Sequence, residues 1–339
     1  MDERNKRALL VGAFGTVAVF AVLFFAVGAR DVIDALRSAA PSLVAATFVL
    51  ALCWLAAWGL MLRSVLTALD VDISARKAFF VYAGAVFANN VTPFGQAGGE
   101  PVAALLISKV SDARYETGLA GIASVDVLNV VPSISLILAG VGYYATTAAI
   151  GDRLETAVGS AVALIAAIVL GMALAWRYRN TIAERLPAVL ASRIGRFGFV
   201  QFDPETLEAN IAGRLERFFE NIERVATDRY RLTIVVGLSL TGWLFQVAAL
   251  TAAFAAIGYS APPYVLLFVI PLANLAGAAP LPGGLGGIEA AFVTLLVPTT
   301  GFPASAITAA VIIFRGAIYW MPVLIGGISA SAFGVRAIE

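Results

Sequence analysis

Two short motifs rich in glycine and proline each end in a glutamate. Residues 93–100 and 282–289 both match P-x-G-x-x-G-x-E, at an offset of 189 positions. A second charged residue follows each glutamate 26 positions later, Asp126 in the first case and Arg315 in the second. Because a charge inside an apolar segment is costly, charges kept at matched positions are candidates for binding or for proton exchange.

The glycines and prolines predict where the backbone leaves helical geometry. Glycine permits the required backbone angles, and proline breaks an incoming helix. The helix after each break is expected to begin near Glu100-Pro101 and near Ile288-Glu289, and its first N–H groups carry partial positive charge. Two such helix ends meeting inside a membrane would suit an anion such as phosphate.

The four charges leave alternatives open. Glu100 and Glu289 either cap their own helices, as acids in a first turn do, or bind a cationic head group or exchange protons during transport. Opposite charges at related positions also predict that Asp126 and Arg315 pair across the axis between the two halves. That pair would be a structural lock or a gate, whereas an isolated Arg315 would hold a lipid phosphate.

The residue types limit the chemistry to binding. The chain has no histidine and a single cysteine, Cys53, which excludes Ser-His-Asp and Cys-His pairs, histidine-ligated metals and an intrachain disulfide. No catalytic residue, metal site or cofactor is therefore predicted. The predicted substrate-binding residues are Glu100, Glu289, Arg315, Asp126, Asn90, Gly98, Gly99, Gly286 and Gly287.

The composition indicates the surroundings in which these residues act. Of 339 residues, 60% are hydrophobic and 13% are charged, whereas soluble domains have about 45–50% apolar and about 25% charged residues. The net charge of +1 gives no reason to expect a nucleic-acid partner. We therefore predict an all-α integral membrane protein.

Six apolar stretches are long enough to cross a bilayer as helices, since about 20 residues are needed. They are Ala8–Gly28, Leu43–Leu62, Gly118–Tyr143, Thr156–Trp176, Leu232–Gly258 and Ala306–Phe333. The first is read as a retained span rather than a signal peptide, because its apolar run exceeds the roughly 7–15 residues of a signal sequence.

Two further apolar stretches, 78–110 and 262–297, are each interrupted midway by one of the motifs, and their arms are mostly too short to cross alone. If both are re-entrant hairpins and the N-terminus is cytoplasmic, 19 of the 23 Lys and Arg residues lie on the cytoplasmic side and 3 outside. If both cross instead, the two sides hold 8 and 14. The positive-inside rule thus favours re-entrant hairpins in a multi-pass cell-membrane protein with both termini cytoplasmic.

The two motifs divide the chain into two copies of one unit. Residues 1–150 contain two spans, the hairpin 78–110 and a third span. Residues 151–339 contain a span, the polar segment 177–231, a span, the hairpin 262–297 and a last span. Each copy crosses an odd number of times, so the second is inverted relative to the first. Inverted repeats with broken helices are typical of transporters that bind substrate at the repeat interface.

The polar segment 177–231 has its own prediction. Its apolar residues recur at three- and four-residue steps from Leu207 to Val225, after the helix-start signal Asp203-Pro204. This pattern predicts an amphipathic helix on the cytoplasmic interface, and a regulatory or partner-docking helix is the alternative.

The two motifs and the residues around them resemble a known family, the flippase-like membrane domain of lysylphosphatidylglycerol synthases. That domain also occurs alone in bacterial and archaeal membrane proteins and fused to some archaeal glycosyltransferases. The residues that carry the resemblance are Asn89-Asn90-Val-Thr-Pro93 through Glu100, Pro280 through Glu289, Phe314-Arg315, Tyr319-Trp320-Met-Pro322 and Gly326.

The resemblance implies movement of a modified lipid between leaflets. Family members often have a Glu-Arg pair and a later Asp in the third span, where this chain has Val125-Asp126 and Asn129, so only Arg315 carries over as a ligand for lipid phosphate. The chain ends at Glu339, just after its last span, and synthase activity is not expected.

We therefore predict a flippase-like or scramblase-like transporter that is not an enzyme. Its partner would be a membrane lipid or lipid-linked glycan, with the head group held between the hairpin tips, and assembly into a homo-oligomer is left open. The alternatives are a membrane enzyme or enzyme subunit acting on lipid-linked substrates, and an ion-coupled transporter of small solutes.

Overall fold

The protein is all-helical in the part of the chain that the structure describes. A computed structural model describes residues 27–92, 96–111, 113–147, 227–278 and 282–335, with isolated residues at 25 and between 166 and 224. The predicted spans Ala8–Gly28 and Thr156–Trp176 and the predicted amphipathic helix lie almost wholly outside the described residues.

In the described part of the chain, pairs of short helices lie between long ones. In chain order they are α2 (Ala29–Arg37), α3 (Pro41–Ala68), α4 (Ala75–Val91), α5 (Gln96–Val110), α6 (Tyr115–Thr147), α10 (Arg229–Ala256), α11 (Pro263–Leu275), the 3-10 turns η1 (Ala276–Ala278) and η2 (Pro282–Gly284), α12 (Gly287–Thr300), α13 (Ala304–Arg315), the π-helical turn η3 (Gly316–Trp320) and α14 (Met321–Val335). Four elements are long and apolar enough to cross a membrane: α3, α6, α10 and the continuous stretch Ala304–Ser329. They confirm four of the six predicted spans.

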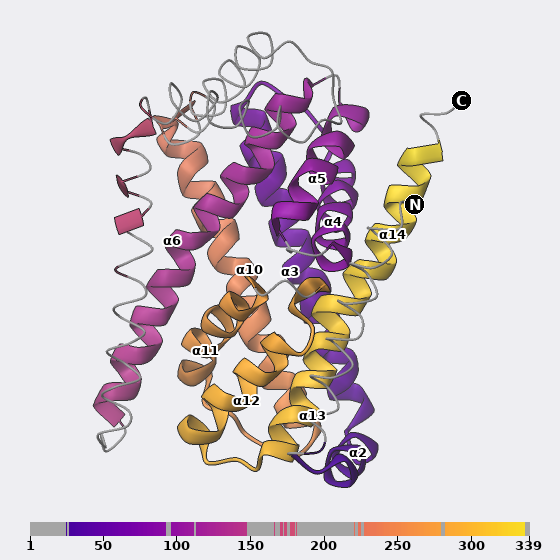
Figure 1. Ribbon diagram of the computed structural model, residues 1–339, viewed down its shortest axis with the longest axis vertical. Helices are drawn as coiled ribbons and strands as arrows, with labels where there is room; N and C mark the ends of the chain where they lie inside the picture. Colours follow the sequence, from indigo (N-terminus) through magenta and orange to yellow (C-terminus); the bar gives the residue numbers. More distant parts are fainter. Residues whose placement is uncertain are drawn as a thin grey trace, which may run out of the picture.

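The short helices form two pairs that enter the bundle from opposite ends. In Figure 1, α4 and α5 occupy the upper half beside the long helices, and α11 and α12 occupy the lower half. Each pair begins and ends at the same end of the bundle, so the C-terminal ends of α4 and α11 both lie near its middle. The helices extend the predicted limits slightly, because α4 begins at Ala75 and α12 ends at Thr300.

One predicted helix start is wrong. The helix after the first motif begins at Gln96 and contains Pro101, whereas we expected it to begin at Glu100-Pro101. Proline inside a helix removes one backbone hydrogen bond and costs about 3 kcal/mol or more in water, which is why the sequence favoured a later start. In the second motif α12 begins at Gly287, one residue from the predicted start.

The packing partners of the two halves correspond. Helix α3 packs against α10, which is its counterpart in chain order. The first short helix of each half packs against the last long element of the other half, α4 against α14 and α11 against α6. Within the halves, the contacts of α5 with α6 and of α12 with α13 also match.

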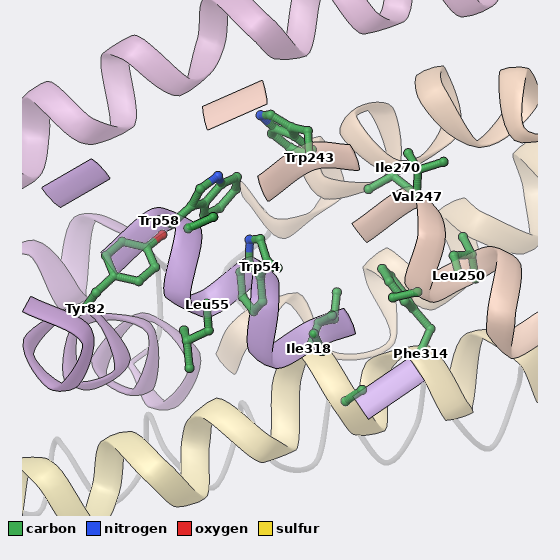
Figure 2. Close-up of a cluster of buried hydrophobic side chains, with 14 of the residues drawn as sticks. Trp54, Leu55, Trp58, Tyr82, Trp243, Val247, Leu250, Ile270, Phe314 and Ile318 are labelled. Carbon is green, nitrogen blue, oxygen red and sulfur yellow. The ribbon is translucent and has the colours of Figure 1, made fainter. Parts of the chain in front are cut away.

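The interface between α3 and α10 forms the centre of the hydrophobic core (Figure 2). The indole ring of Trp58 packs edge-on against Trp54 and Trp243, with 5.4 Å between ring centroids in both cases. Its N–H donates to the carbonyl oxygen of Ser239 at 3.2 Å, and Gly242 leaves room for the ring. The core therefore joins the halves through aromatic surface and a buried hydrogen bond.

Small residues allow the cross-half contacts to be close. A side chain at Gly140 of α6 would place its Cβ 2.6 Å from the carbonyl oxygen of Tyr264 in α11. A side chain at Gly326 of α14 would collide with the carbonyl oxygen of Ala83 in α4. Close backbone approach at small residues is a common basis for helix association in membranes.

This packing predicts a difference between two glycines on one helix. The substitution Gly140→Ala should destabilise the protein by about 1–3 kcal/mol, because backbone atoms must move to admit the methyl group. Gly142→Ala is the matched control, since nothing lies within 4 Å of its Cβ position. Thermal unfolding in detergent should show a lower midpoint for Gly140→Ala only, and equal midpoints for the two variants would contradict the prediction.

Candidate functional site

The buried ion pair between Glu289 and Arg315 is the strongest polar feature of the second half. Arg315 Nε donates to Glu289 Oε1 at 2.8 Å, and the two side chains are only 9% and 4% exposed. The other carboxylate oxygen of Glu289 accepts from the backbone N–H of Gly286 at 2.6 Å. Glu289 is thus the third residue of α12 and caps that helix while it pairs with Arg315.

The local backbone explains how this pair is positioned. Gly286 has a φ of +86° and Gly283 a φ of +55°, values that glycine adopts readily and other residues rarely do. The resulting turn points the carbonyl of Gly283 at the guanidinium group, which donates to it at 3.0 Å. The guanidinium group of Arg315 therefore binds both the carboxylate of Glu289 and the backbone of the turn that precedes α12.

A π-helical turn places an aromatic ring against the same guanidinium group. Arg315 ends α13, and η3 follows directly. Tyr319 is part of this turn. The centroid of its ring lies 4.8 Å from the guanidinium carbon of Arg315, which is within the range of a cation–π interaction. Single π-helical turns inside α-helices are frequent at functional sites.

The tips of the two short-helix pairs meet at this ring. The hydroxyl of Tyr319 donates to the carbonyl oxygen of Asn90 at 3.1 Å, and Asn90 lies one residue before the end of α4. A Cβ at Gly283 would lie 3.0 Å from the same carbonyl oxygen, so the second turn is in close contact with the end of α4. Residues 93–95 and 279–281 of the turns lie outside the described residues.

The first half has a different pair at the equivalent positions. The carboxyl groups of Glu100 on α5 and Asp126 on α6 lie within hydrogen-bonding reach of each other. Glu100 is partly exposed, whereas Asp126 Oδ2 is fully buried and has no hydrogen-bond donor among the described residues. The first half therefore has two acids, Glu100 and Asp126, at the positions where the second half has the acid Glu289 and the base Arg315.

This arrangement corrects the expected pairing of the charges. We predicted that Asp126 and Arg315 pair across the axis between the halves, but each charge pairs with the glutamate of its own half. The helix-cap interpretation holds for Glu289 and fails for Glu100, because Glu100 lies beyond the first turn of α5.

The predicted glycines and Asn90 take several structural roles. Gly98 lies in the first turn of α5, and Gly287 is the first residue of α12. Gly99 is buried against Asn89, whose side chain would overlap any Cβ at that position. Asn90 contributes its backbone carbonyl to the contact between the tips.

Sequence reasoning missed the part played by Tyr319 and Gly283. Gly283 lies within the second motif but outside its matched positions, and Tyr319 follows Arg315 by four residues, which in a helix places both on one face. The four-residue spacing could have indicated that Tyr319 lies beside Arg315. The π-helical turn left no signal, since its residues are as apolar as their neighbours.

Comparison with known proteins gives one family over nearly the whole chain. The family described as lysylphosphatidylglycerol synthase TM region matches residues 9–326. A UPF0104 membrane protein of Methanothermobacter thermautotrophicus is 29% identical over 98% of this chain and 95% of its own length. A UPF0104 membrane protein of Pyrococcus horikoshii is 24% identical over 82% of each chain.

A longer protein also matches. The glycosyltransferase AglD of Haloferax volcanii is 29% identical over 91% of this chain. The match covers 52% of that protein, so this chain corresponds to about half of it.

The buried pair predicts strong energetic coupling between its members. Replacing one partner, as in Glu289→Gln or Arg315→Gln, should destabilise the protein by about 3–5 kcal/mol, because it leaves a buried charge unpaired or a donor unsatisfied. The double variant should lose less than the sum of the single losses, and denaturant unfolding in mixed micelles measures all three.

The exposed pair of Arg37 and Asp34 supplies the control for this cycle. Its charged atoms are 4.0 Å apart and both side chains are more than 70% exposed, so Asp34→Asn should leave the unfolding free energy almost unchanged. Additive losses at Glu289 and Arg315 would show that the two side chains do not stabilise each other.

Proposed function

We propose that this chain, which belongs to the family of the lysylphosphatidylglycerol synthase TM region, moves a lipid or lipid-linked molecule between the two leaflets of the membrane. It is an integral membrane protein with several apolar helices. The proposal rests on the site between the hairpin tips, and membership of a membrane-protein family supports it.

The observation that carries the proposal is the meeting of two turns beside a buried charge pair. The tip contact through Tyr319 joins Asn90 of one short-helix pair to Gly283 of the other. Irregular backbone at membrane depth is tolerated only where protein buries it or where it lines a water-filled cavity. Two such turns entering from opposite sides give a substrate access to one site from either leaflet.

The corresponding packing of the two halves supports an inverted repeat. We propose that residues 1–150 and 151–339 are two upside-down copies and that 78–110 and 262–297 are re-entrant hairpins. The reciprocal contacts of α4 with α14 and of α11 with α6 are those that a two-fold axis in the membrane plane requires. Alternating access then follows from movement of one copy against the other.

Arg315 is the proposed ligand of the head group. Its planar guanidinium group suits a phosphate, which can accept two parallel hydrogen bonds from it. In the structure the carboxylate of Glu289 occupies this role, at a distance of 2.8 Å. A lipid phosphate would compete with that carboxylate, while the acyl or prenyl chains remain in the bilayer.

The charge distribution supports an orientation. The upper end of the bundle in Figure 1, where α3 and α5 end and α4, α6 and α10 begin, carries the described basic residues Arg63, Arg76, Lys77, Lys109, Arg114, Arg229 and Arg231. The lower end carries Arg30 and Arg37. We propose that the upper end is cytoplasmic and that both termini lie on that side.

A membrane enzyme, or the membrane part of one, is the second candidate. The observation in its favour is the name of the Haloferax relative, a glycosyltransferase that this chain matches over about half its length. In that case the chain would hold a lipid-linked substrate for a catalytic partner. Sugar transfer to a lipid acceptor by the purified protein would favour this candidate.

Reconstituted vesicles test the transport function. Purified protein should move fluorescent phosphatidylglycerol, phosphatidylethanolamine or a polyprenyl-linked sugar between leaflets, measured as the fraction of label that an impermeant quencher reaches over time. The variant Arg315→Gln should fall to the level of protein-free vesicles, because no other described side chain offers the same fork of donors at the tips. Gly142→Ala should retain the movement, since its Cβ position is open.

The outcome that would overturn the function is specific. If the wild type moves none of the three lipids faster than protein-free vesicles, the proposal fails. If Arg315→Gln elutes as a folded protein and transports like the wild type, the head group binds elsewhere.

Single cysteines test the orientation. In a Cys53→Ser background, Asp72→Cys lies in the exposed connection between α3 and α4, and Ser260→Cys lies in the exposed connection between α10 and α11. In intact cells an impermeant thiol reagent should label Ser260→Cys, and Asp72→Cys only after the membrane is opened. The reverse pattern would invert the proposed topology.

A further inference from the structure

The two halves differ in how they neutralise the glutamate of their motif. In the second half Glu289 faces a guanidinium group at 2.8 Å. In the first half Glu100 faces Asp126, at the position 189 residues before Arg315. The repeat therefore preserves the contact but replaces the base with a second acid.

Two ionised acids in contact would be strongly unfavourable at this location. One charged acid at the centre of a membrane helix already costs about 2.5–3.5 kcal/mol. Two carboxylates that share a site repel each other, so that one of them retains its proton. Among the described residues no lysine or arginine acts on either group, so this part of the chain offers the pair no neutralising base.

The hydrogen bonds lead to the same requirement. Two carboxylates are both acceptors and neither can donate to the other. This is why Asp126 Oδ2 is buried without a donor. A single proton between Glu100 and Asp126 supplies the missing donor and removes one negative charge at the same time.

The surroundings of the pair are otherwise neutral in the described part of the chain. From α4, the phenol of Tyr82 lies within electrostatic range of Asp126, and Tyr82 is 5% exposed. One turn further along α6, the side chain of Asn129 accepts from the hydroxyl of Ser239 on α10. Nothing in these contacts replaces the proton.

We propose that Glu100 and Asp126 form a proton-binding site in the first half and that its loading and release couple lipid movement to a proton gradient. The coupling rests on the proposed transport function, whereas the proton site does not. Glu100 is partly exposed, and on this proposal it is where the proton enters, while the buried oxygen of Asp126 retains the proton inside.

Infrared spectroscopy tests the proton site without any transport assay. Purified protein at neutral pH should show the carbonyl band of a protonated carboxylic acid, shifted in heavy water. Asp126→Asn should lose the band, because the remaining acid, Glu100, is partly exposed. Glu100→Gln should shift the band, because it changes the hydrogen-bond partner of Asp126. Asp72→Asn is the matched control, since Asp72 is exposed between α3 and α4. Absence of the band in the wild type, or its unchanged survival in both variants, would overturn the site.

Vesicles with a pH gradient test the coupling. If one proton moves with each lipid, a gradient of one pH unit should shift the steady-state ratio of labelled lipid between leaflets about tenfold, because one pH unit corresponds to a tenfold change in an equilibrium constant. Asp126→Asn should bring the ratio back to about one, and Asp72→Asn should keep the tenfold shift.

The outcomes separate the two proposals. Lipid movement without any shift by the pH gradient would overturn coupling and leave transport intact. A shift caused by a sodium gradient at constant pH would replace the proton with a metal cation. No lipid movement at all would overturn the transport function, while the infrared band would still decide the proton site.

Discussion

Backbone that turns inside an apolar layer must be hydrogen-bonded by the protein or line a water-filled cavity, and this constraint would act on the site if the proposed hairpins are re-entrant. Three backbone groups at the described tips each have a specific side-chain partner. Glu289 accepts from the N–H of Gly286, Arg315 donates to the carbonyl of Gly283, and Tyr319 donates to the carbonyl of Asn90. An unsatisfied group would cost several kcal/mol in hydrocarbon, so the charged and aromatic residues are first of all what permits the turns to exist.

The same side chains also connect elements that are distant in the sequence. Tyr319 reaches α4 across 229 positions, and Arg315 reaches back over 26 positions to Glu289. The close glycine contacts at Gly140 and Gly326 hold α11 and α4 against the last long helix of the opposite half. The tips are therefore fixed relative to both halves, and a change at either tip must be transmitted to the helices that carry it. This coupling is what an alternating mechanism needs.

Much of this arrangement could be predicted from the sequence, because apolar length and motif spacing reflect membrane thickness and repetition directly. The spans that contain α3, α6, α10 and α13–α14 followed from length alone. The two pairs of short helices followed from the Gly/Pro motifs that interrupt the other apolar stretches and from the Lys/Arg count. The partners of the charges did not follow, because opposite signs at Asp126 and Arg315 favoured a pair between the halves. The repeated spacing of 26 residues was the better guide, since a spacing kept in both halves while the second residue changes from acid to base reflects a contact within each half. The start of α5 was missed because tertiary contacts at Gly99 and Asn89 outweigh the local preference of Pro101.

The difference between the halves also bears on which of them moves. Separating Glu289 from Arg315 exposes two full charges to an apolar interior, and the loss of several kcal/mol opposes any motion that pulls α12 from α13. The pair of Glu100 and Asp126 has a less costly alternative, because its net charge changes by gain or loss of a proton. A conformational change costs less where a pair can gain or lose a proton than where it must separate two full charges. If the proposed proton site couples transport, we expect α5 and α6 to be the side of the site that moves and α12 and α13, where Tyr319 packs on Arg315, to be the rigid side.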